Sequence, residues 1–302
     1  MPNVWTHILF SEEVVDAITN PISFPNESFI KLGAQGPDPL FYYRFWPWVK
    51  DEPVREIGMA IHTKKCGDFL MDLIISGKYA SQQAQAFIIG FVTHHILDRN
   101  THPYIHYRAG YQGSNHQKLE IIIDTLLAEK KYNLKTWKTK VYKEIDVGRH
   151  LDRDIVHILH DTIRKHYPEH HQDSPAYIQK AYRDMLLALK ILYDPYGWKN
   201  ALIPSLISSY SHQPVEDDRD YLNLSHSTWY HSATNEPSNK SFMELFEESK
   251  MEAVEVITEI IRYWKEEQSS IHNLKTLIGD ISYDTGKPVE LGLENKYYDA
   301  II

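Results

Sequence analysis

A stretch of apolar residues that leads into three evenly spaced metal-ligand side chains constrains the fold of this chain most strongly. Residues 86–92 are nearly all apolar, and His94, Asp98 and His102 follow at intervals of four residues. Side chains at this interval share one face of an α-helix, so the pattern predicts a buried helix over about residues 81–101. A buried stripe of this kind is costly without partners, and either a metal ion or a hydrogen-bonded network of His and Asp would supply them.

Helical periodicity also dominates the rest of the sequence. Gly is sparse, with 13 residues, and strict alternation of apolar and polar residues is hard to find. No linker rich in Pro, Gly or Ser divides the chain, so we expect an all-α fold in a single domain spanning residues 1–302. The expected helices lie at about 8–19, 54–76, 81–101, 115–130, 150–166, 175–193, 196–210 and 241–268.

Local signals mark the ends of several of these helices. Ser114 with Gln117, and Ser241 with Glu244, have the spacing of a capping box, in which the two side chains satisfy free backbone N–H groups. The Asn-Pro pair at residues 20–21 is expected to end the first helix, because the residue before a proline disfavours helical backbone.

The cysteine and charge counts exclude several classes of protein. The chain has 17 His and one Cys, so it cannot form an internal disulfide or a thiolate zinc finger. Any metal site must therefore use His, Asp and Glu. The net charge of −9 disfavours non-specific binding to nucleic acid, which needs clustered Lys and Arg.

Further candidate ligands lie on either side of the His94 stripe. His116 and Glu120 are four residues apart at the start of a predicted helix, and Asp124 follows as either another ligand or a carboxylate that orients one. Residues 33–39 hold two Gly and two Pro around Asp38, which would present that carboxylate on a rigid loop or merely stabilise a turn. His62, in the helix expected at 54–76, is a further candidate ligand. The alternative interpretation is a hydrogen-bonded histidine of the core.

His7 has the same alternative and completes a set of eight candidate ligands. Eight hard or borderline ligands are too many for one tetrahedral site, and they suit two or three adjacent divalent ions. Such clusters promote phosphoester hydrolysis by lowering the pKa of bound water to about 7. The candidate ligands are His7, Asp38, His62, His94, Asp98, His102, His116 and Glu120.

The order of these motifs resembles that of the bacterial zinc-dependent phospholipase C family. The motifs are Trp-Thr-His, Gly-Pro-Asp-Pro, an isolated His, His-x3-Asp-x3-His-Pro and His-x3-Glu, and they cover about residues 1–125. The resemblance implies an all-α fold related to single-strand-specific zinc nucleases, with three zinc ions in a cleft among helices. In secreted members a Trp begins the mature chain and its amino group binds the third zinc, whereas Trp5 is internal here.

The resemblance also implies which side chains would share each ion. Asp38, His62, His94 and Asp98 would bind one zinc, His102, His116 and Glu120 a second, and His7 and Asp98 a third. We expect two or three zinc ions per chain, with Mn and Fe as alternatives for the same ligands. Helical register favours His102 over His106 as the ligand that follows Asp98.

These expectations lead to a metal-dependent hydrolase of the phospholipase C type, with Asp38 orienting or deprotonating the attacking water. The expected substrate is a phospholipid or a related phosphodiester, and nucleic acid is disfavoured. The alternatives are a nuclease or small-molecule phosphodiesterase, and a non-catalytic binding protein stabilised by metal. The chain has no signal-peptide pattern and no run of about 18 apolar residues, so we expect a cytoplasmic protein with at most peripheral membrane contact.

Four other features carry weaker interpretations. Cys66 is expected to be a small core residue. The histidines between residues 150 and 171 lie among charged residues, and we interpret them as a solvated helix face. Residues 130–143 are rich in Lys and contain Trp137, and we interpret them as a solvated connection with contact to an anionic membrane as the alternative. Residues 211–240 lack periodicity, as a lid or a plain surface loop would.

Overall fold

The structure is a computed structural model that describes residues 3–18, 26–46, 48–49, 53–170, 172–266 and 271–302. This part of the chain is mostly helical, which confirms the all-α prediction. Its strands, β1 (Trp229–Tyr230) and β2 (Pro237–Ser238), pair antiparallel within the loop region expected at 211–240. In the described residues, no helix is long and apolar enough to cross a membrane.

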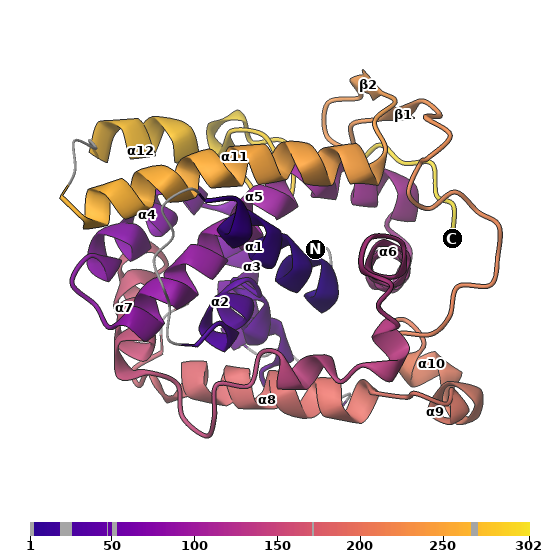
Figure 1. The fold of residues 1–302 in the computed structure, drawn as a ribbon, viewed down its shortest axis with the longest axis horizontal. Helices are drawn as coiled ribbons and strands as arrows, with labels where there is room; N and C mark the ends of the chain where they lie inside the picture. The colour runs from indigo at the N-terminus through magenta and orange to yellow at the C-terminus, as the bar shows by residue number, and fades with distance from the viewer. Residues whose placement is uncertain (1–2, 19–25, 47, 50–52, 171, 267–270) are drawn as a thin grey trace.

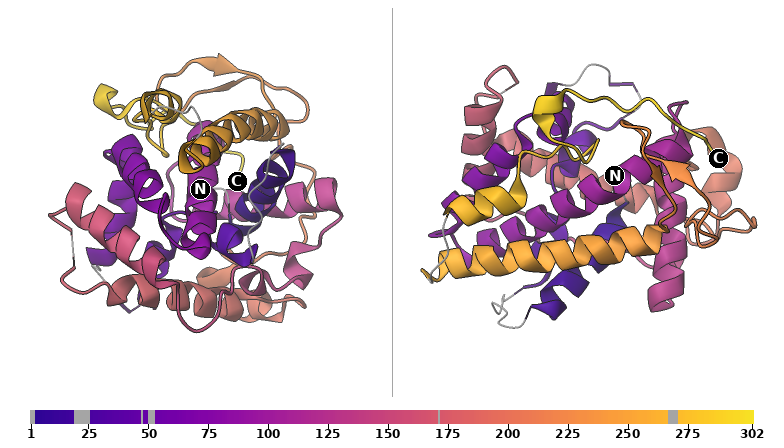
Figure 2. Two further views of the ribbon diagram at one scale, coloured as in Figure 1. Left: turned by 60° about the vertical axis from the view of Figure 1, so that its left-hand side comes forward. Right: turned by 90° about the horizontal axis from the view of Figure 1, so that it is seen from above.

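One long helix, α5 (Gln82–Ala109), forms the centre of the molecule and is buried along most of its length. In Figure 1 it runs behind α11 (Phe242–Trp264), and Figure 2 shows it enclosed by helices in two further views. The helices packed against it come from both halves of the sequence: α1 (Val4–Ala17), α2 (Ser28–Gly33), α4 (Cys66–Gly77), α6 (Asn115–Tyr132), α7 (Arg153–His166) and α11 (Phe242–Trp264).

The remaining elements surround this assembly. Helix α8 (Ala176–Leu192) runs along the lower edge in Figure 1, and α6 is seen end-on. The remaining α-helices are α3 (Pro53–Thr63), α8 (Ala176–Leu192), α9 (Trp198–Leu202), α10 (Pro204–Ile207) and α12 (Ile271–Ile278). The 3-10 turns are η1 (Asp38–Tyr42), η2 (Thr136–Lys138), η3 (Val141–Lys143) and η4 (Val289–Leu291).

Two glycines allow α2 to lie directly on α5. A Cβ atom at Gly90 would come 2.1 Å from the Ile30 carbonyl oxygen, and one at Gly33 would come 2.0 Å from the Phe87 carbonyl oxygen. Only residues without a side chain permit this backbone-to-backbone contact. The contact holds the loop after α2, which carries Asp38, against the His94 turn of α5.

Two of the predicted helices are wrong because each is divided in the structure. The helix expected at 54–76 breaks into α3 and α4 at Lys65, which has a positive φ of 49°. The N-terminus of α4 is held by a distant group, since the Gly67 N–H donates to Asp280 Oδ1 at 2.8 Å. The helix expected at 196–210 breaks into α9 and α10 at Ile203, because the following Pro204 disfavours helical backbone there.

Two helices, α1 and α5, have an end that differs clearly from expectation. Helix α1 begins earlier than expected, because the Asn3 side chain accepts a hydrogen bond from the Val4 N–H. Its expected end at residues 20–21 lies outside the described residues. Helix α5 continues eight residues beyond 101 and through Pro103. Gly286 packs against the Arg99 carbonyl, for which Pro103 has no N–H to donate: a Cβ at Gly286 would lie 2.1 Å from that oxygen.

One of the two predicted capping boxes is confirmed. The Ser241 side chain accepts from the Glu244 N–H, and the Glu244 carboxylate accepts from the Ser241 N–H. The prediction at Ser114 is wrong, because this side chain makes no capping bond and instead lies 2.7 Å from Ser209 Oγ. A tertiary contact has taken the place of the local one.

The interpretation of the middle histidines as a solvated face is wrong for two of them. His150 and His157 are exposed, but His160 and His166 are buried. Helix α7 packs against α4 and α8, and His166 Nε2 lies 2.5 Å from Asp72 Oδ2 on α4. His171 lies outside the described residues. Cys66 is buried, as expected.

The contact between α2 and α5 yields a stability prediction. Replacing Gly90 with Ala should lower the free energy of unfolding by about 3 kcal/mol, because its methyl group would strike backbone that cannot move aside. Gly58→Ala is the matched control, since that methyl would meet only the Phe41 ring at 3.0 Å or more. Urea unfolding measures both changes, and equal losses for the two variants would contradict the packing described here.

Candidate metal centre

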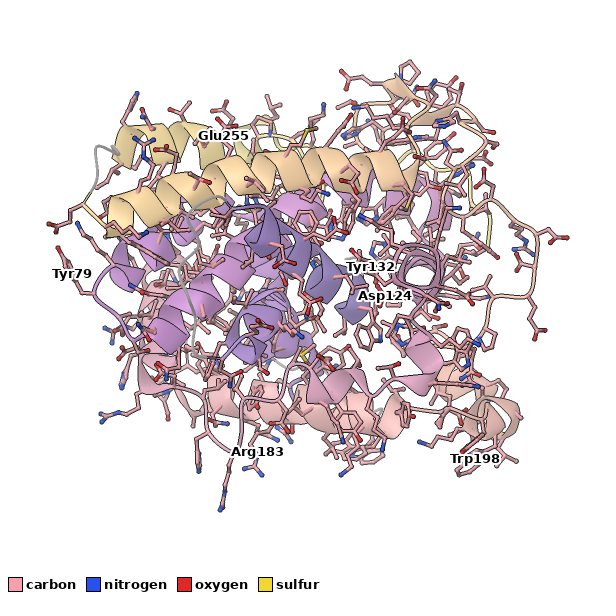
Figure 3. All side chains as sticks on the ribbon, in the orientation of Figure 1. Tyr79, Asp124, Tyr132, Arg183, Trp198 and Glu255 are labelled. Carbon is pink, nitrogen blue, oxygen red and sulfur yellow. The ribbon has the colours of Figure 1, made fainter. Side chains whose placement is uncertain are left out.

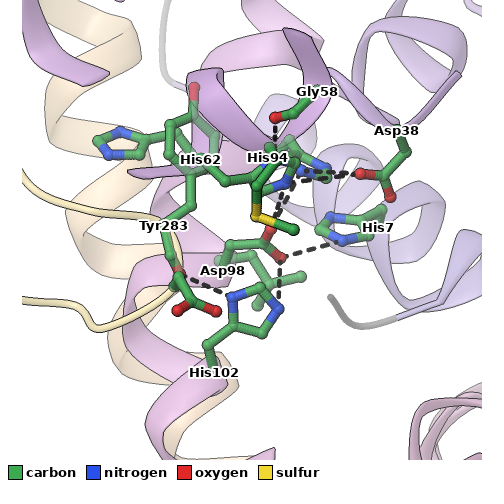
Figure 4. Close-up of polar contacts among 12 residues, drawn as sticks. His7, Asp38, Gly58, His62, His94, Asp98, His102 and Tyr283 are labelled. Atoms are coloured by element: carbon green, nitrogen blue, oxygen red, sulfur yellow. Dashed lines mark hydrogen bonds and ion pairs between the residues drawn. The ribbon is translucent and has the colours of Figure 1, made fainter. Parts of the chain in front are cut away.

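The carboxylate of Asp98 lies among four histidine side chains in the interior of the molecule (Figure 4). All four present the Nε2 atom to it. The distances from Nε2 to the nearer Asp98 oxygen are 3.3 Å for His7, 3.8 Å for His62, 3.0 Å for His94 and 4.0 Å for His102. Helix α5 supplies the stripe of His94, Asp98 and His102, while α1 and α3 supply the other two histidines.

Three of these histidines have their orientation fixed by backbone carbonyl groups on the other ring nitrogen. The Nδ1 atoms of His62, His94 and His102 lie 2.7, 3.0 and 2.7 Å from their carbonyl partners. The partners are the carbonyl oxygens of Gly58, Ala34 and Tyr283, respectively. A carbonyl oxygen can only accept, so each Nδ1 carries the proton and each neutral ring directs an Nε2 lone pair at the acidic centre.

At the centre, hydrogen-bond acceptors therefore face one another: unprotonated Nε2 atoms on one side and the Asp98 carboxylate oxygens on the other. Both Asp98 oxygens, His94 Nε2 and His102 Nε2 are buried and make no hydrogen bond to any residue that the structure describes. Leaving such groups unpaired is costly, and a cation between them removes that cost. The side chains thus fit a divalent metal ion, and the carbonyl-bound Nδ1 atoms are the outer contacts that metal-binding histidines usually make.

The pKa values of the cluster reflect the same lack of compensation. Burial raises the pKa of the Asp38 carboxyl to about 8 and lowers the pKa of the His7 and His62 imidazoles to about 4 each. For His94, the carboxylates of Asp98 and Asp38 outweigh burial and raise the pKa. A bound cation would favour the ionised Asp38 carboxylate and the neutral form of each imidazole, because its charge stabilises the carboxylate and the nitrogen lone pairs directly.

The potential ligand atoms form three groups of three, and within each group all atoms lie within 4.8 Å of one another. His94 belongs to two of the groups, so these two adjoin. The groups are His7, His94 and Asp98; Asp38, His62 and His94; and His102, His116 and Glu120. All eight sequence-predicted ligands are present in these groups, and whether they bind metal stays a prediction.

Asp38 reaches the cluster from the loop after α2. Its Oδ1 atom lies 3.6 Å from His62 Nε2 and 3.8 Å from His94 Nε2. Gly36, with a φ of 51°, makes room for this approach, since a Cβ there would lie 2.4 Å from His94 Cδ2. Gly33 and Gly36 therefore allow the backbone of this loop to pass close to α5 and to the His94 ring.

The third group is built between α5 and α6. His116 Nε2 lies 2.6 Å from Glu120 Oε1 on the first turns of α6. Its ring centroid is 5.7 Å from that of His102. His106 lies close by, but its Nε2 atom is 2.6 Å from Asp284 Oδ1 and so is already engaged. The geometry therefore groups His102, rather than His106, with His116 and Glu120.

Asp124 does not belong to any of the three groups. Its carboxylate accepts hydrogen bonds from the Trp5 and Thr6 N–H groups at 3.0 and 2.9 Å. His212 Nε2 lies 2.9 Å from it on the other side. Asp124, labelled on α6 in Figure 3, thus anchors the turn of α1 that carries His7, and the Trp5 backbone nitrogen is used in that contact.

Sequence reasoning missed the contribution of the C-terminal region. Besides the Tyr283 carbonyl, the Tyr283 N–H donates to the His62 carbonyl at 3.0 Å, and Asp284 engages His106. The only signal in the sequence was the turn-forming Asp-Thr-Gly at residues 284–286. A turn signal gives no information about which distant helix the turn contacts.

The fold and the centre define an all-α protein with a carboxylate surrounded by histidines. A family model for zinc-dependent phospholipase C matches residues 6–156, which are 151 of the 302 residues. The chain therefore belongs to the zinc-dependent phospholipase C family. Searches of curated proteins and of solved structures returned no match.

The position of Asp98 yields a prediction about metal content and stability. Asp98→Asn should lose most of its bound zinc, because the amide cannot supply the negative charge that faces the four Nε2 atoms. At a zinc concentration 100-fold above the wild-type Kd, the loss of one ion would lower the free energy of unfolding by about 2.7 kcal/mol. Elemental analysis and thermal unfolding measure the two effects.

A chelator and a second variant separate metal loss from a general folding defect. With chelator, wild type and Asp98→Asn should differ far less in stability than they do with zinc. Asp72→Asn is the matched control, since this carboxylate pairs with Lys165 and His166 outside the cluster. If Asp98→Asn keeps the wild-type zinc content, the assignment of a metal centre fails.

The competing positions of His102 and His106 give a separate test. His102→Gln should remove about one zinc ion per chain, whereas His106→Gln should retain the wild-type content because its neighbour Asp284 already occupies its Nε2 atom. Elemental analysis of the two purified variants decides between them. Zinc loss in His106→Gln alone would reverse the assignment.

Proposed function

We propose that the chain is a zinc-dependent phosphodiester hydrolase of the phospholipase C type. The observation that carries the proposal is Asp98, one carboxylate within 4.0 Å of Nε2 atoms from four histidines. Structural zinc sites are usually closed by four ligands of their own. Asp98 instead directs one oxygen at His7 and the other at His94, and adjoining ligand groups on either side of one carboxylate suit the paired ions of phosphoester hydrolases, which lie about 3.5–4 Å apart.

The proposed ligands follow the three groups and the family resemblance. Asp38, His62, His94 and Asp98 would hold one zinc, and His102, His116 and Glu120 a second. His7 and Asp98 would hold a third, so we propose two or three ions per chain. Bound there, zinc would polarise a phosphoryl group and acidify water.

The side chains themselves have two roles, the orientation of metal ligands and the handling of the attacking water. His62, His94 and His102 are held in one tautomer by backbone carbonyls, so they need not reorganise when substrate arrives. Asp38 is the carboxylate that approaches from a loop rather than from the core helix. We assign to it the orientation of the attacking water and the acceptance of its proton.

The surroundings favour a lipid or small diester over nucleic acid. Among the described residues, Asp38 and Asp98 form ion pairs with histidines alone, and His116 lies beside Glu120. An aromatic ring lies beside the cluster instead, with the Phe41 centroid 5.5 Å from that of His62. Nucleic-acid sites combine stacking rings with basic side chains, and this pairing is not found among the described residues around the cluster.

We also propose that the whole chain acts as one domain. Ligand side chains lie within residues 7–120, but the carbonyl that orients His102 belongs to Tyr283. The Arg99 guanidinium joins α5 to the Ile278 carbonyl at the end of α12. The centre thus depends on contacts that span nearly the full sequence.

The activity test compares zinc-loaded wild type with Asp38→Asn on a chromogenic soluble phosphodiester. Loss of the proposed proton acceptor should reduce kcat by about 100-fold or more. Asp68→Asn, an exposed carboxylate on α4, is the control and should keep wild-type kcat. Phosphatidylcholine micelles and single-stranded DNA are then compared as substrates. No hydrolysis of any diester by zinc-loaded protein would sink the enzyme proposal in favour of a metal-stabilised binding protein.

A further inference from the structure

An apolar projection extends from the molecule at α9 and α10, on the far side of the chain from α4. Helix α9 has no buried residue, although its sequence is mostly apolar. The exposed fractions are 88% for Tyr196, 55% for Trp198, 71% for Leu202 and 45% for Ile203. We call these four residues the tip. Their apolar side chains are exposed to solvent, and no packing contact in the described part of the fold accounts for this exposure.

The turn beneath the tip is firmly built. The Asp194 carboxylate accepts from the Asn200 N–H at 2.9 Å and from its side chain at 3.0 Å. The Lys199 ammonium donates to the carbonyls of Ile191 and Tyr193 at the end of α8. The polar groups of the turn therefore bond inward, and the outer face is left apolar.

A positively charged segment lies next to the tip. Residues 130–143 contain six Lys and no acidic residue, in a chain whose net charge is −9. Lys135, Lys138, Lys140 and Lys143, here called the lysine strip, are exposed and form no ion pair with any described residue. Four cations without an ion-pair partner beside exposed aromatic residues form a surface that is complementary to a negatively charged, partly apolar one.

Contacts to Tyr193 place the strip and the tip side by side. The Tyr193 hydroxyl donates to the Lys138 carbonyl at 3.0 Å, and Lys140 Nζ lies 5.8 Å from the Tyr193 ring centroid. Trp137 of the strip segment and Asp194 of the tip turn line the same small cavity. In Figure 3, Trp198 projects at the lower edge of the molecule, as does Arg183 of α8.

The same region is bonded to the helix that carries His116 and Glu120. Ser209, just after α10, lies 2.7 Å through its Oγ atom from Ser114 Oγ at the start of α6. His212 bonds to Asp124 further along α6. The segment that follows the tip is therefore attached directly to the helix that carries two of the candidate ligands.

We propose that the tip and the lysine strip together dock the protein on an anionic lipid surface. Trp and Tyr are amphipathic and settle at the level of lipid headgroups, while nearby Lys residues are attracted to anionic lipid. The inference rests on the proposed function, since it identifies the source of the phosphodiester as a lipid interface rather than a free diester. The proposed docking surface has no residue in common with the candidate metal ligands, so the two proposals can be tested separately.

The experiment measures sedimentation of the zinc-loaded protein with vesicles of phosphatidylcholine and phosphatidylserine, and with phosphatidylcholine alone. The tip variant Trp198→Ser/Leu202→Ser and the strip variant Lys135→Gln/Lys138→Gln should each bind the anionic vesicles roughly tenfold more weakly than wild type. Strip-dependent binding should fall as salt is raised, and tip-dependent binding should persist in part.

Matched controls test whether position, rather than composition, matters. Tyr79→Ser removes an exposed aromatic ring at the opposite end of the molecule, and Lys265→Gln/Lys275→Gln removes two exposed cations elsewhere. Both should bind vesicles like wild type. All variants should keep wild-type activity on the soluble chromogenic diester, which shows that they fold.

Each outcome decides one of two questions. Absence of wild-type binding to anionic vesicles, unchanged binding by the tip and strip variants, or equal losses in the controls would overturn the docking proposal. If light scattering shows that the tip variant has half the molecular mass of wild type, the tip contacts a second copy of the chain instead of a lipid surface. Vesicle binding without hydrolysis of any diester would leave docking in place and overturn the proposed function.

Discussion

The buried carboxylate of Asp98 is the group on which the arrangement of the interior depends. It lies on the central helix with no hydrogen-bond donor in the described chain, and four Nε2 atoms face it. A buried carboxylate is costly without compensation, and the four imidazoles that converge on it form an arrangement that fits a cation at the centre. Helices α1, α3 and α5 therefore meet at the Asp98 carboxylate through their histidine side chains, in addition to their apolar packing.

Holding four imidazoles around one carboxylate requires close backbone contacts. Gly33 and Gly90 let α2 lie on α5, which carries the Ala34 carbonyl to the Nδ1 atom of His94. Gly36 then leaves room for the His94 ring where any side chain would collide with it. The glycines therefore act on the electrostatics of the site, since each contact that they permit fixes the direction of a histidine lone pair.

Period and spacing in the sequence were enough to predict the all-α class and the buried α5 stripe, and the family resemblance placed His102 with His116 and Glu120, three residues whose ligand atoms lie close together in the structure. Period and spacing failed where distant contacts replaced local signals. Ser114 has capping-box spacing but bonds to Ser209, and the break at Lys65 interrupts an unbroken helical pattern because Asp280 caps the next helix. Such partners lie 95 and 213 residues away, and no local pattern encodes them.

The same reasoning explains why Tyr283 contributes to the site although the recognisable motifs end near residue 125. A ligand is a side-chain identity, which a motif records, whereas the group that orients it here is a carbonyl that any residue offers. Tyr283 contributes its backbone to His102 and His62, so its side-chain identity leaves no trace of this task. Motifs thus record which side chains are candidate ligands, and the path of the whole chain sets the direction from which their atoms converge.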